Sequence, residues 1–169
     1  MKKNILIIDG TNLEYKIFYV AHANAKRTHT TELDLISRYL TSYKKLIEKF
    51  QPDEVYASWD KRISQGSSNY RKDMLKGQYK AGRTRHPDIQ TLFDTEPKII
   101  EVLSSLGVKH IFPNVLEADD VLAWLVDNID GYKTVVSGDH DMLQLVDEDT
   151  SVWNLNRLTT LDTFLDHVG

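Results

Sequence analysis

The sequence predicts an α/β fold, in which a mainly parallel central sheet of about five strands is covered by helices on both faces. Short, continuously apolar runs alternate along the chain with longer stretches of helical periodicity. Several of the apolar runs stop at an aspartate, as buried parallel strands do where they meet a loop. The 169 residues, 41% of them apolar, suffice for the core of one globular domain, which we assign to 1–169.

The first elements come from the clearest patterns. A buried strand is expected over 4–8, and a helix over 33–50 whose apolar residues recur at helical spacing. Pro52 stops that helix, and a second strand follows over 54–59. The stretch from 60 to 88 contains no clear core element, which is long for a loop and typical of functional or disordered segments.

The second half continues the alternation. A helix over 88–106 with Gly107 as its C-cap leads to a third strand over 108–112, and a helix follows over 117–129. Gly131 then turns the chain, and the remaining expectations are a strand over 133–136, a short helix over 142–146 and a fifth strand over 151–155.

The composition excludes several kinds of protein. Without cysteine there is no disulfide, thiolate metal site or cysteine nucleophile, so a metal must be held by carboxylates or by the six histidines. No run approaches the roughly 18 apolar residues of a membrane span, and the N-terminal run ends at Asp9 without a signal-peptide pattern. We therefore expect a soluble intracellular protein with no membrane partner.

The charge is unevenly distributed. The basic segment from Lys61 to Arg85 carries eight Lys and Arg against one acid, Asp73, for a net charge of +7. From 114 to 169, twelve acids face two basic residues, for a net charge of −10. Most charged runs are simply solvated surface, so the position of these residues must decide whether they have a function.

The acidic residues follow the predicted strands, and we name them together the acidic rim: Asp9, Asp60, Glu117, Asp119, Asp120, Asp139 and Asp141. Because ligands of open α/β sheets bind at the carboxyl ends of the strands, these side chains are expected to converge. A single aspartate there is more often a turn former or helix cap, but seven crowded carboxylates repel one another unless a cation neutralises them. Oxygen-only ligands suit Mg²⁺ or Mn²⁺. His140 is left out of this site.

Particular residues exclude two other classes of protein that have acidic active sites. Residues 7–11 are similar to the motif of haloacid-dehalogenase-type phosphatases, but Ile7 stands where that chemistry needs a nucleophilic aspartate. A receiver domain needs paired acids after the first strand, where this chain has only Asp9.

Five motifs in order carry a more specific resemblance: DGTNL at 9–13, WD at 59–60, YKAGR at 79–83, EADD at 117–120 and SGDHDMLQL at 137–145. With them the chain resembles the phage and bacterial 5'-nucleases, the 5'-3' exonucleases and flap endonucleases that include the nuclease domain of DNA polymerase I. The resemblance implies a PIN-like three-layer fold. It also implies hydrolysis of phosphodiesters near 5' ends or branch points of DNA or RNA–DNA hybrids, in replication, primer removal or repair, in the cytoplasm of a bacterium or phage-infected cell.

In such nucleases, the acids matching Asp9, Asp60, Glu117, Asp119 and Asp120 bind one metal ion, and those matching Asp139 and Asp141 contribute to a second. Two ions about 4 Å apart would generate hydroxide and stabilise the leaving 3' oxygen. Residues 61–87 correspond to the helical arch of the family, with Lys80 and Arg83 as the residues that hold the scissile phosphate. Further nucleic-acid contacts are expected from Lys16, Arg71, Lys72, Lys76 and Tyr79.

A charge argument supports the arch independently, because an acidic metal site repels DNA and a basic segment must attract the phosphates. Members of the family continue into a DNA-binding helix-three-turn-helix that supplies two more Asp ligands, whereas this chain stops at Gly169. The expectation is a fragment, or a split or minimal relative, whose second metal site is incomplete and is completed by a downstream segment or a separate polypeptide. Two alternatives stay open: a structure-specific nucleic-acid-binding module that cleaves poorly, and a PIN-type ribonuclease.

Overall fold

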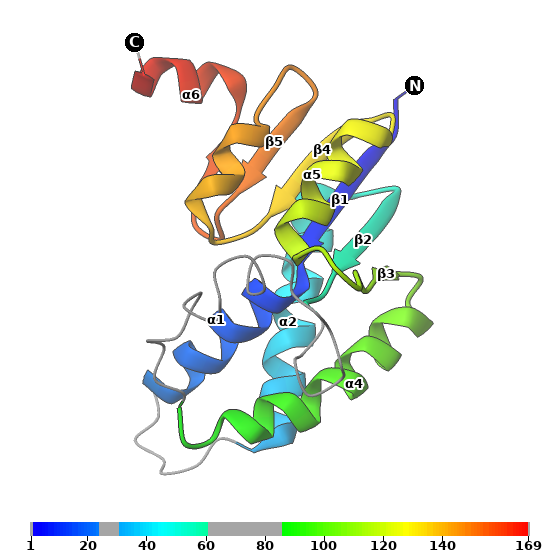
Figure 1. Ribbon diagram of the computed structural model, residues 1–169, viewed down its shortest axis with the longest axis vertical. Coiled ribbons are helices and arrows are strands. Elements are labelled where there is room, and N and C mark those ends of the chain that lie inside the picture. Colours follow the sequence, from blue (N-terminus) through cyan, green and yellow to red (C-terminus); the bar gives the residue numbers. More distant parts are fainter. Residues whose placement is uncertain (1, 24–30, 61–85, 169) are drawn as a thin grey trace.

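A computed structural model describes residues 2–23, 31–60 and 86–168 of the chain (Figure 1). Its elements, in chain order, are β1 (Asn4–Asp9), α1 (Gly10–Ala23), α2 (Glu32–Phe50), β2 (Glu54–Ser58), α4 (Ile89–Ser105), β3 (Lys109–Ile111), α5 (Ala118–Asn128), β4 (Tyr132–Val136), the 3-10 helix η2 (His140–Leu145), β5 (Thr150–Trp153), β6 (Leu158–Thr159) and α6 (Leu161–Val168). The strands form one six-stranded sheet in the order β3-β2-β1-β4-β5-β6. All neighbouring pairs are parallel except β5 with β6.

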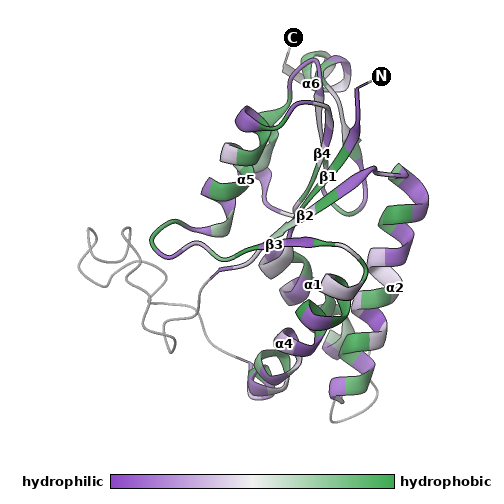
Figure 2. Cartoon of the chain, turned by 90° about the vertical axis from the view of Figure 1, so that its right-hand side faces the viewer, coloured by the Kyte–Doolittle hydropathy of each residue, from purple (hydrophilic) through white to green (hydrophobic). Residues whose placement is uncertain are grey.

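The central strand β1 separates two layers of helices. Leu6 and Ile8 pack into a core with residues of α1, α2 and α4, whereas Ile5 and Ile7 pack on the opposite face against α5. Figure 2 shows α5 on one side of the sheet and α2 on the other. Because successive side chains of a strand point to opposite faces, a fully apolar strand is the signature of a sheet buried on both sides. The predicted α/β class with helices on both faces is thus confirmed.

The order of the predicted strands and helices agrees with the structure, with shifts of one or two residues at their ends. Several details differ, and helix α6 has no counterpart among the expected elements. The helix over 89–105 has Leu106 as its C-cap, and Gly107 is the next residue, with φ +86°. The short helix expected over 142–146 is a 3-10 helix that begins at His140, and a sixth strand follows the expected fifth.

Helix α1 begins directly at the end of β1, without a loop, and sequence analysis did not anticipate it. One cause is Glu14, which lies on the buried face of α1 and is only 1% exposed, so it interrupts the apolar pattern. Gly10 permits the direct transition, because a Cβ there would lie 2.7 Å from the ring of Trp59. The tight junction places Asp9 at the very edge of the sheet.

Local hydrogen bonds set the ends of α2. Thr31 and Asp34 form a reciprocal capping box at its start, and Gln51 ends it in the left-handed region with φ 44°.

Within the described ranges, none of the helices combines the length and the apolar character needed to cross a membrane.

Candidate metal centre

The acidic rim lies along the carboxyl edge of the sheet. Asp9 is the last residue of β1, and Asp60 and Asp139 follow shortly after the two strands that flank it, β2 and β4. The remaining members stand at the first turns of α5 and η2. All seven residues belong to the described part of the chain.

Asp9 is the buried member of the rim, with 7% of its surface exposed. Its carboxylate accepts hydrogen bonds from the backbone N–H of Asn12 at 2.9 Å and from the hydroxyl of Ser137 at 2.9 Å. Burial raises the pKa of Asp9 to about 6, and the nearby charges of Asp60 and Asp119 push the pKa in the same direction. The three carboxylates are therefore close enough to interact electrostatically.

Asp60 connects the end of β2 to two helices. Its backbone N–H donates to the hydroxyl of Thr11 in α1 at 2.8 Å. Its Oδ1 accepts from the backbone N–H of Ala118, the first residue of α5, at 2.7 Å. Asp60 thereby fixes the start of α5, and with it the position of the acids in the first turn of that helix.

Ser137 and Asn12 connect the rim on the β4 side. The Ser137 hydroxyl donates to Asp9 and accepts from the backbone N–H of Asp139 at 3.2 Å. The side-chain oxygen of Asn12 accepts from the N–H of Gly138 at 2.8 Å. Asp141 is held in turn, because its N–H donates to Oδ1 of Asp139 at 3.0 Å. These links orient the acids as the outer hydrogen bonds of metal sites orient their ligands.

Sequence reasoning assigned no role to Thr11, Asn12 or Ser137, although all three stand inside the quoted motifs. Their common signal is a polar side chain within three residues of a rim acid. Polar residues are frequent in turns, so this signal alone does not separate a supporting residue from an ordinary turn residue.

The start of α5 combines capping with a candidate ligand set. Asp120 accepts a hydrogen bond from the N–H of Glu117 at 3.0 Å, and Asp119 accepts from the N–H of Asp120 at 2.8 Å. These acids therefore satisfy donors at the helix N-terminus, where the helix dipole also favours negative charge. Capping explains these hydrogen bonds, and the charge of Asp119 also contributes to the raised pKa of Asp9.

The donor set fits a hard divalent cation, because every candidate ligand of the rim is a carboxylate. In the described residues, the one group of three His, Asp or Glu whose ligand atoms all lie within 4.8 Å of one another is a different one, His22 with His86 and Asp88. A shared ion at the rim would therefore draw the carboxylates inward from their hydrogen-bonded positions, against the mutual repulsion that otherwise separates them.

Lys16 lines a groove between α1 and α2, to which Trp153 of β5 and Leu155 also contribute. The groove has a volume of about 430 Å³, and its charged lining is exclusively basic: Lys16, Arg38, Lys45 and Lys49. We call these four residues the basic groove. The other predicted nucleic-acid contacts lie outside the described residues: Arg71, Lys72, Lys76, Tyr79, Lys80 and Arg83.

The fold and the rim together define a class of protein: an α/β domain that carries a row of carboxylates at the carboxyl edge of its mainly parallel sheet. A family model described as the 5'-3' exonuclease N-terminal, resolvase-like domain matches residues 4–168, and the chain belongs to this family. This confirms the resemblance that the five sequence motifs indicated.

Two curated relatives show how much of a larger protein the chain covers. It is 31% identical over 160 residues to DNA polymerase I of Streptococcus pneumoniae, covering 89% of this chain and 17% of the polymerase. It is 30% identical over 177 residues to the 5'-3' exonuclease of Bacillus subtilis, covering 98% of this chain and 57% of that protein. The chain thus spans only part of the length of the relatives it matches.

Solved structures show the same fold. The bacteriophage T5 D15 protein, co-crystallised with metal ions, superposes with a TM-score of 0.72 at 21% identity over 98% of this chain and 60% of that one. A second structure of the T5 D15 flap endonuclease, in a complex with DNA and metal ions, superposes with a TM-score of 0.70, also at 21% identity and the same coverage.

Proposed function

We propose that this chain is the catalytic domain of a metal-dependent 5'-nuclease that hydrolyses phosphodiesters near the 5' ends or branch points of DNA. One observation carries the proposal: seven carboxylates lie at one edge of the sheet in a chain that belongs to the 5'-3' exonuclease domain family. The cations proposed are Mg²⁺ or Mn²⁺, because oxygen-only ligands suit both.

Asp9, Asp60 and Asp119 are the proposed ligands of the first ion, together with the neighbouring acids of α5. When bound, divalent ions supply the positive charge that stabilises the attacking and leaving oxygens of an in-line displacement. The chain itself contributes orientation: Ser137 and the N–H of Asn12 hold Asp9, whose pKa of about 6 leaves it mostly ionised at neutral pH and above. Asp139 and Asp141 are the proposed ligands of a second ion.

The basic groove is the proposed path for a DNA backbone that approaches the rim. Its four cations come from two helices, and α1 connects the groove to the end of β1. Lys80 and Arg83 are proposed to hold the scissile phosphate on the basis of the YKAGR motif alone. The T5 relative is a flap endonuclease recorded in a complex with DNA and metal ions, which supports DNA as the substrate class. An RNA–DNA hybrid is a further proposed substrate.

The test compares three Asp→Asn variants along the helix α5. Asp119→Asn and Asp120→Asn remove charges from the rim, whereas Asp127→Asn removes an exposed charge at the far end of the same helix. With a labelled 5'-flap substrate and Mn²⁺ or Mg²⁺, we expect the two rim variants to cut at least about 10²-fold more slowly than wild type. Asp127→Asn should cut at the wild-type rate, and EDTA should stop all cleavage.

Binding measurements distinguish a nuclease from a binding module. Calorimetric titration with Mn²⁺ should show weaker binding in both rim variants and unchanged binding in Asp127→Asn. The proposal is wrong if Asp119→Asn and Asp120→Asn cleave as fast as wild type. Tight binding of flap DNA without metal-dependent cleavage by the wild-type chain would instead support the binding module.

A further inference from the structure

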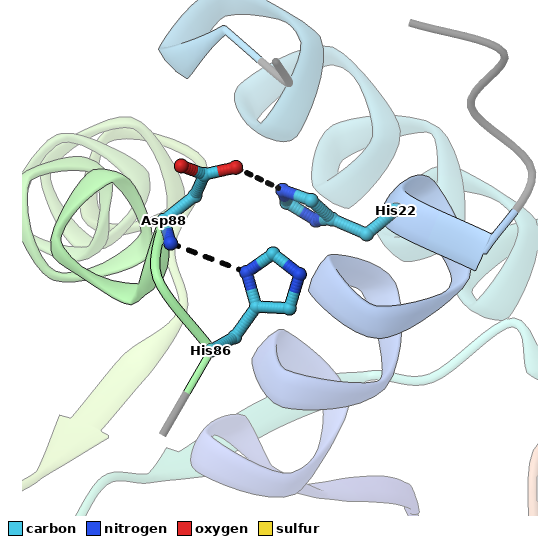
Figure 3. A group of neighbouring side chains, drawn as sticks. All are labelled: His22, His86 and Asp88. Atoms are coloured by element: carbon cyan, nitrogen blue, oxygen red, sulfur yellow. Dashed lines mark hydrogen bonds and ion pairs between the residues drawn. The ribbon is translucent and has the colours of Figure 1, made fainter. Parts of the chain in front are cut away.

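A second cluster of metal-ligand residues lies away from the acidic rim. His22 is in the last turn of α1, and His86 and Asp88 stand in the segment that leads into α4. One ligand atom from each residue can be chosen so that all three atoms lie within 4.8 Å of one another. Figure 3 shows the three side chains converging on one another from these two parts of the chain. We call this group the histidine cluster.

One pair in the cluster has the spacing of two ligands of one zinc ion. Nε2 of His22 lies 3.3 Å from Oδ2 of Asp88. Two bonds of about 2.0–2.1 Å that open at the tetrahedral angle place their ligand atoms about 3.3–3.4 Å apart. A ligand atom of His86 lies within 4.8 Å of ligand atoms of His22 and Asp88, so an inward movement of the side chains would complete a three-ligand set.

The surroundings of His22 prepare Nε2 as a ligand. Its other nitrogen, Nδ1, lies 2.8 Å from the backbone carbonyl oxygen of Phe18, which can only accept a hydrogen bond. Nδ1 therefore carries the proton in the neutral ring, and the lone pair of Nε2 faces Asp88. This hydrogen bond to a carbonyl is the outer contact that metal-binding histidines commonly make.

The ring of Phe18 packs against both histidines of the cluster. Phe18 is fully buried, and its ring centroid lies 4.1 Å from that of His22 and 5.2 Å from that of His86. The three cluster residues are themselves half-buried. Nδ1 of His86 accepts a long hydrogen bond of 3.2 Å from the N–H of Asp88, and a bond from His86 to a metal would take the place of this weak contact.

We propose that the histidine cluster is a zinc site, formed by His22, His86 and Asp88 with water as the fourth ligand, that fastens the end of α1 to the start of α4. Two imidazole nitrogens favour Zn²⁺ over Mg²⁺ or Mn²⁺, which prefer oxygen ligands. The site shares no residue with the acidic rim, so this inference goes beyond the proposed nuclease function. It joins residues 64 positions apart, on the two sides of the basic segment in the sequence.

A metal-free role is the alternative that the experiment must exclude. A protonated His22 could form a plain ion pair with Asp88, with the His86 ring packed 4.4 Å from that of His22. Such a contact would hold α1 against α4 without any specific response to zinc.

Cobalt is the probe that separates this site from the acidic rim. Co²⁺ in a four-coordinate site with nitrogen ligands absorbs visible light strongly, whereas octahedral Co²⁺ bound by oxygens absorbs weakly. We expect metal-free wild-type protein to give the intense spectrum with one equivalent of Co²⁺, and Zn²⁺ to abolish it by displacement. Zinc should also raise the melting temperature by several degrees at concentrations far above its dissociation constant.

Three variants locate the ion. His22→Asn and Asp88→Asn each remove a proposed ligand, and each should lose the intense spectrum and weaken Zn²⁺ binding at least about tenfold. His140→Asn is the control, because His140 is an exposed histidine beside the acidic rim. This control should keep both the spectrum and the zinc-dependent rise in melting temperature.

Asp88→Asn also separates loss of the metal site from loss of the fold, because the substitution is nearly isosteric and circular dichroism can confirm that the variant is folded. The proposal is overturned if wild type gives only the weak octahedral spectrum. It is equally overturned if His140→Asn loses the signal while folded Asp88→Asn keeps it, since the nitrogen ligand would then belong to the rim.

Discussion

At the level of single residues, the ionisation of Asp9 makes the stability of the fold depend on pH. Burial first, and the neighbouring charges next, raise its pKa from 3.8 to about 6, which corresponds to about 3 kcal/mol. A raised folded-state pKa means that folding favours the protonated acid. The contribution of Asp9 to stability is thus fully present below pH 3.8, decreases as the pH rises, and is lost above about pH 6.

The variant Asp9→Asn tests this pH dependence, because an amide has no charge to bury. In EDTA, the free energy of unfolding of the variant minus that of wild type should increase by about 2 kcal/mol between pH 4.5 and pH 8. At pH 8, saturating Mn²⁺ should make the wild-type protein more stable than the variant, since the ion stabilises the wild-type protein more. Urea denaturation at both pH values gives the measurement, and a pH-independent difference in EDTA would contradict the assignment.

Ser137 has the clearest supporting role among single residues, since its buried hydroxyl bonds to both Asp9 and Asp139. Ser137→Ala should lower the free energy of unfolding by about 1–3 kcal/mol and weaken Mn²⁺ binding by about 10–100-fold. Ser58 is the matched control: it is the last residue of β2, it is fully buried, and its hydroxyl makes no hydrogen bond in the described part of the chain.

Ser58→Ala should leave Mn²⁺ affinity unchanged. Calorimetry on both serine variants makes the comparison, and equal losses of affinity would show that hydroxyl removal anywhere at this sheet edge disturbs the rim. The role of Ser137 would then be nonspecific.

Residue-level prediction from sequence works where a residue follows a clear strand. Asp9 and Asp60 could be placed at one edge because both end recognisable apolar runs. The histidine cluster could not be found in this way, because His22 and His86 are far apart in sequence and follow no ligand spacing. Only the packing of α4 against α1 brings them together.

At the level of elements, the junction of β1 and α1 depends on Gly10. In Gly10→Ala, the new Cβ would meet the ring of Trp59 at 2.7 Å, and that fully buried ring is also fixed by a 2.8 Å hydrogen bond to His110. We expect a loss of about 1–3 kcal/mol in unfolding free energy from overpacking, with a change in tryptophan fluorescence.

Gly107→Ala provides the comparison for this junction. Its Cβ would meet nothing within 4 Å, so the only cost is the left-handed backbone, at about 1 kcal/mol, and the fluorescence should stay as in wild type. Urea titrations followed by fluorescence measure both effects. If the fluorescence spectrum of folded Gly10→Ala is identical to that of wild type, the close contact is refuted.

Helices and strands could be predicted where the apolar residues recur with a single regular spacing. The long helix α2 shows regular apolar spacing, and Pro52 marks its end. Helix α1 was missed because the buried face includes Glu14, and a buried acid is not part of an amphipathic pattern. Strand β6 has two residues, too few for any periodicity.

At the level of the whole molecule, a chain with net charge −4 is proposed to bind a polyanion, so the arrangement of charge must matter more than its sum. The +7 basic segment was visible in the sequence because its residues are consecutive. The basic groove was not, because its cations come from two helices and alternate with apolar residues. Only the packing of α1 beside α2 collects them on one surface.

The salt dependence of DNA binding tests the basic groove. Each phosphate contact that is lost reduces the slope of log affinity against log salt concentration by about 0.9. Lys16→Ala and Lys45→Ala should each weaken binding of a 5'-flap DNA, regardless of its sequence, and lower the slope by about one. The measurement is fluorescence anisotropy between 50 and 200 mM salt, in EDTA so that the DNA stays intact.

Lys2→Ala is the control for this titration, because Lys2 is an exposed lysine that pairs with Asp149, at the amino-terminal side of the sheet and opposite the rim. Its removal changes the net charge as much as either groove variant does, yet it should leave the slope unchanged. If all three variants lower affinity and slope equally, the DNA responds only to the total charge. The basic groove would then have no special part in binding, and the backbone path would have to lie elsewhere.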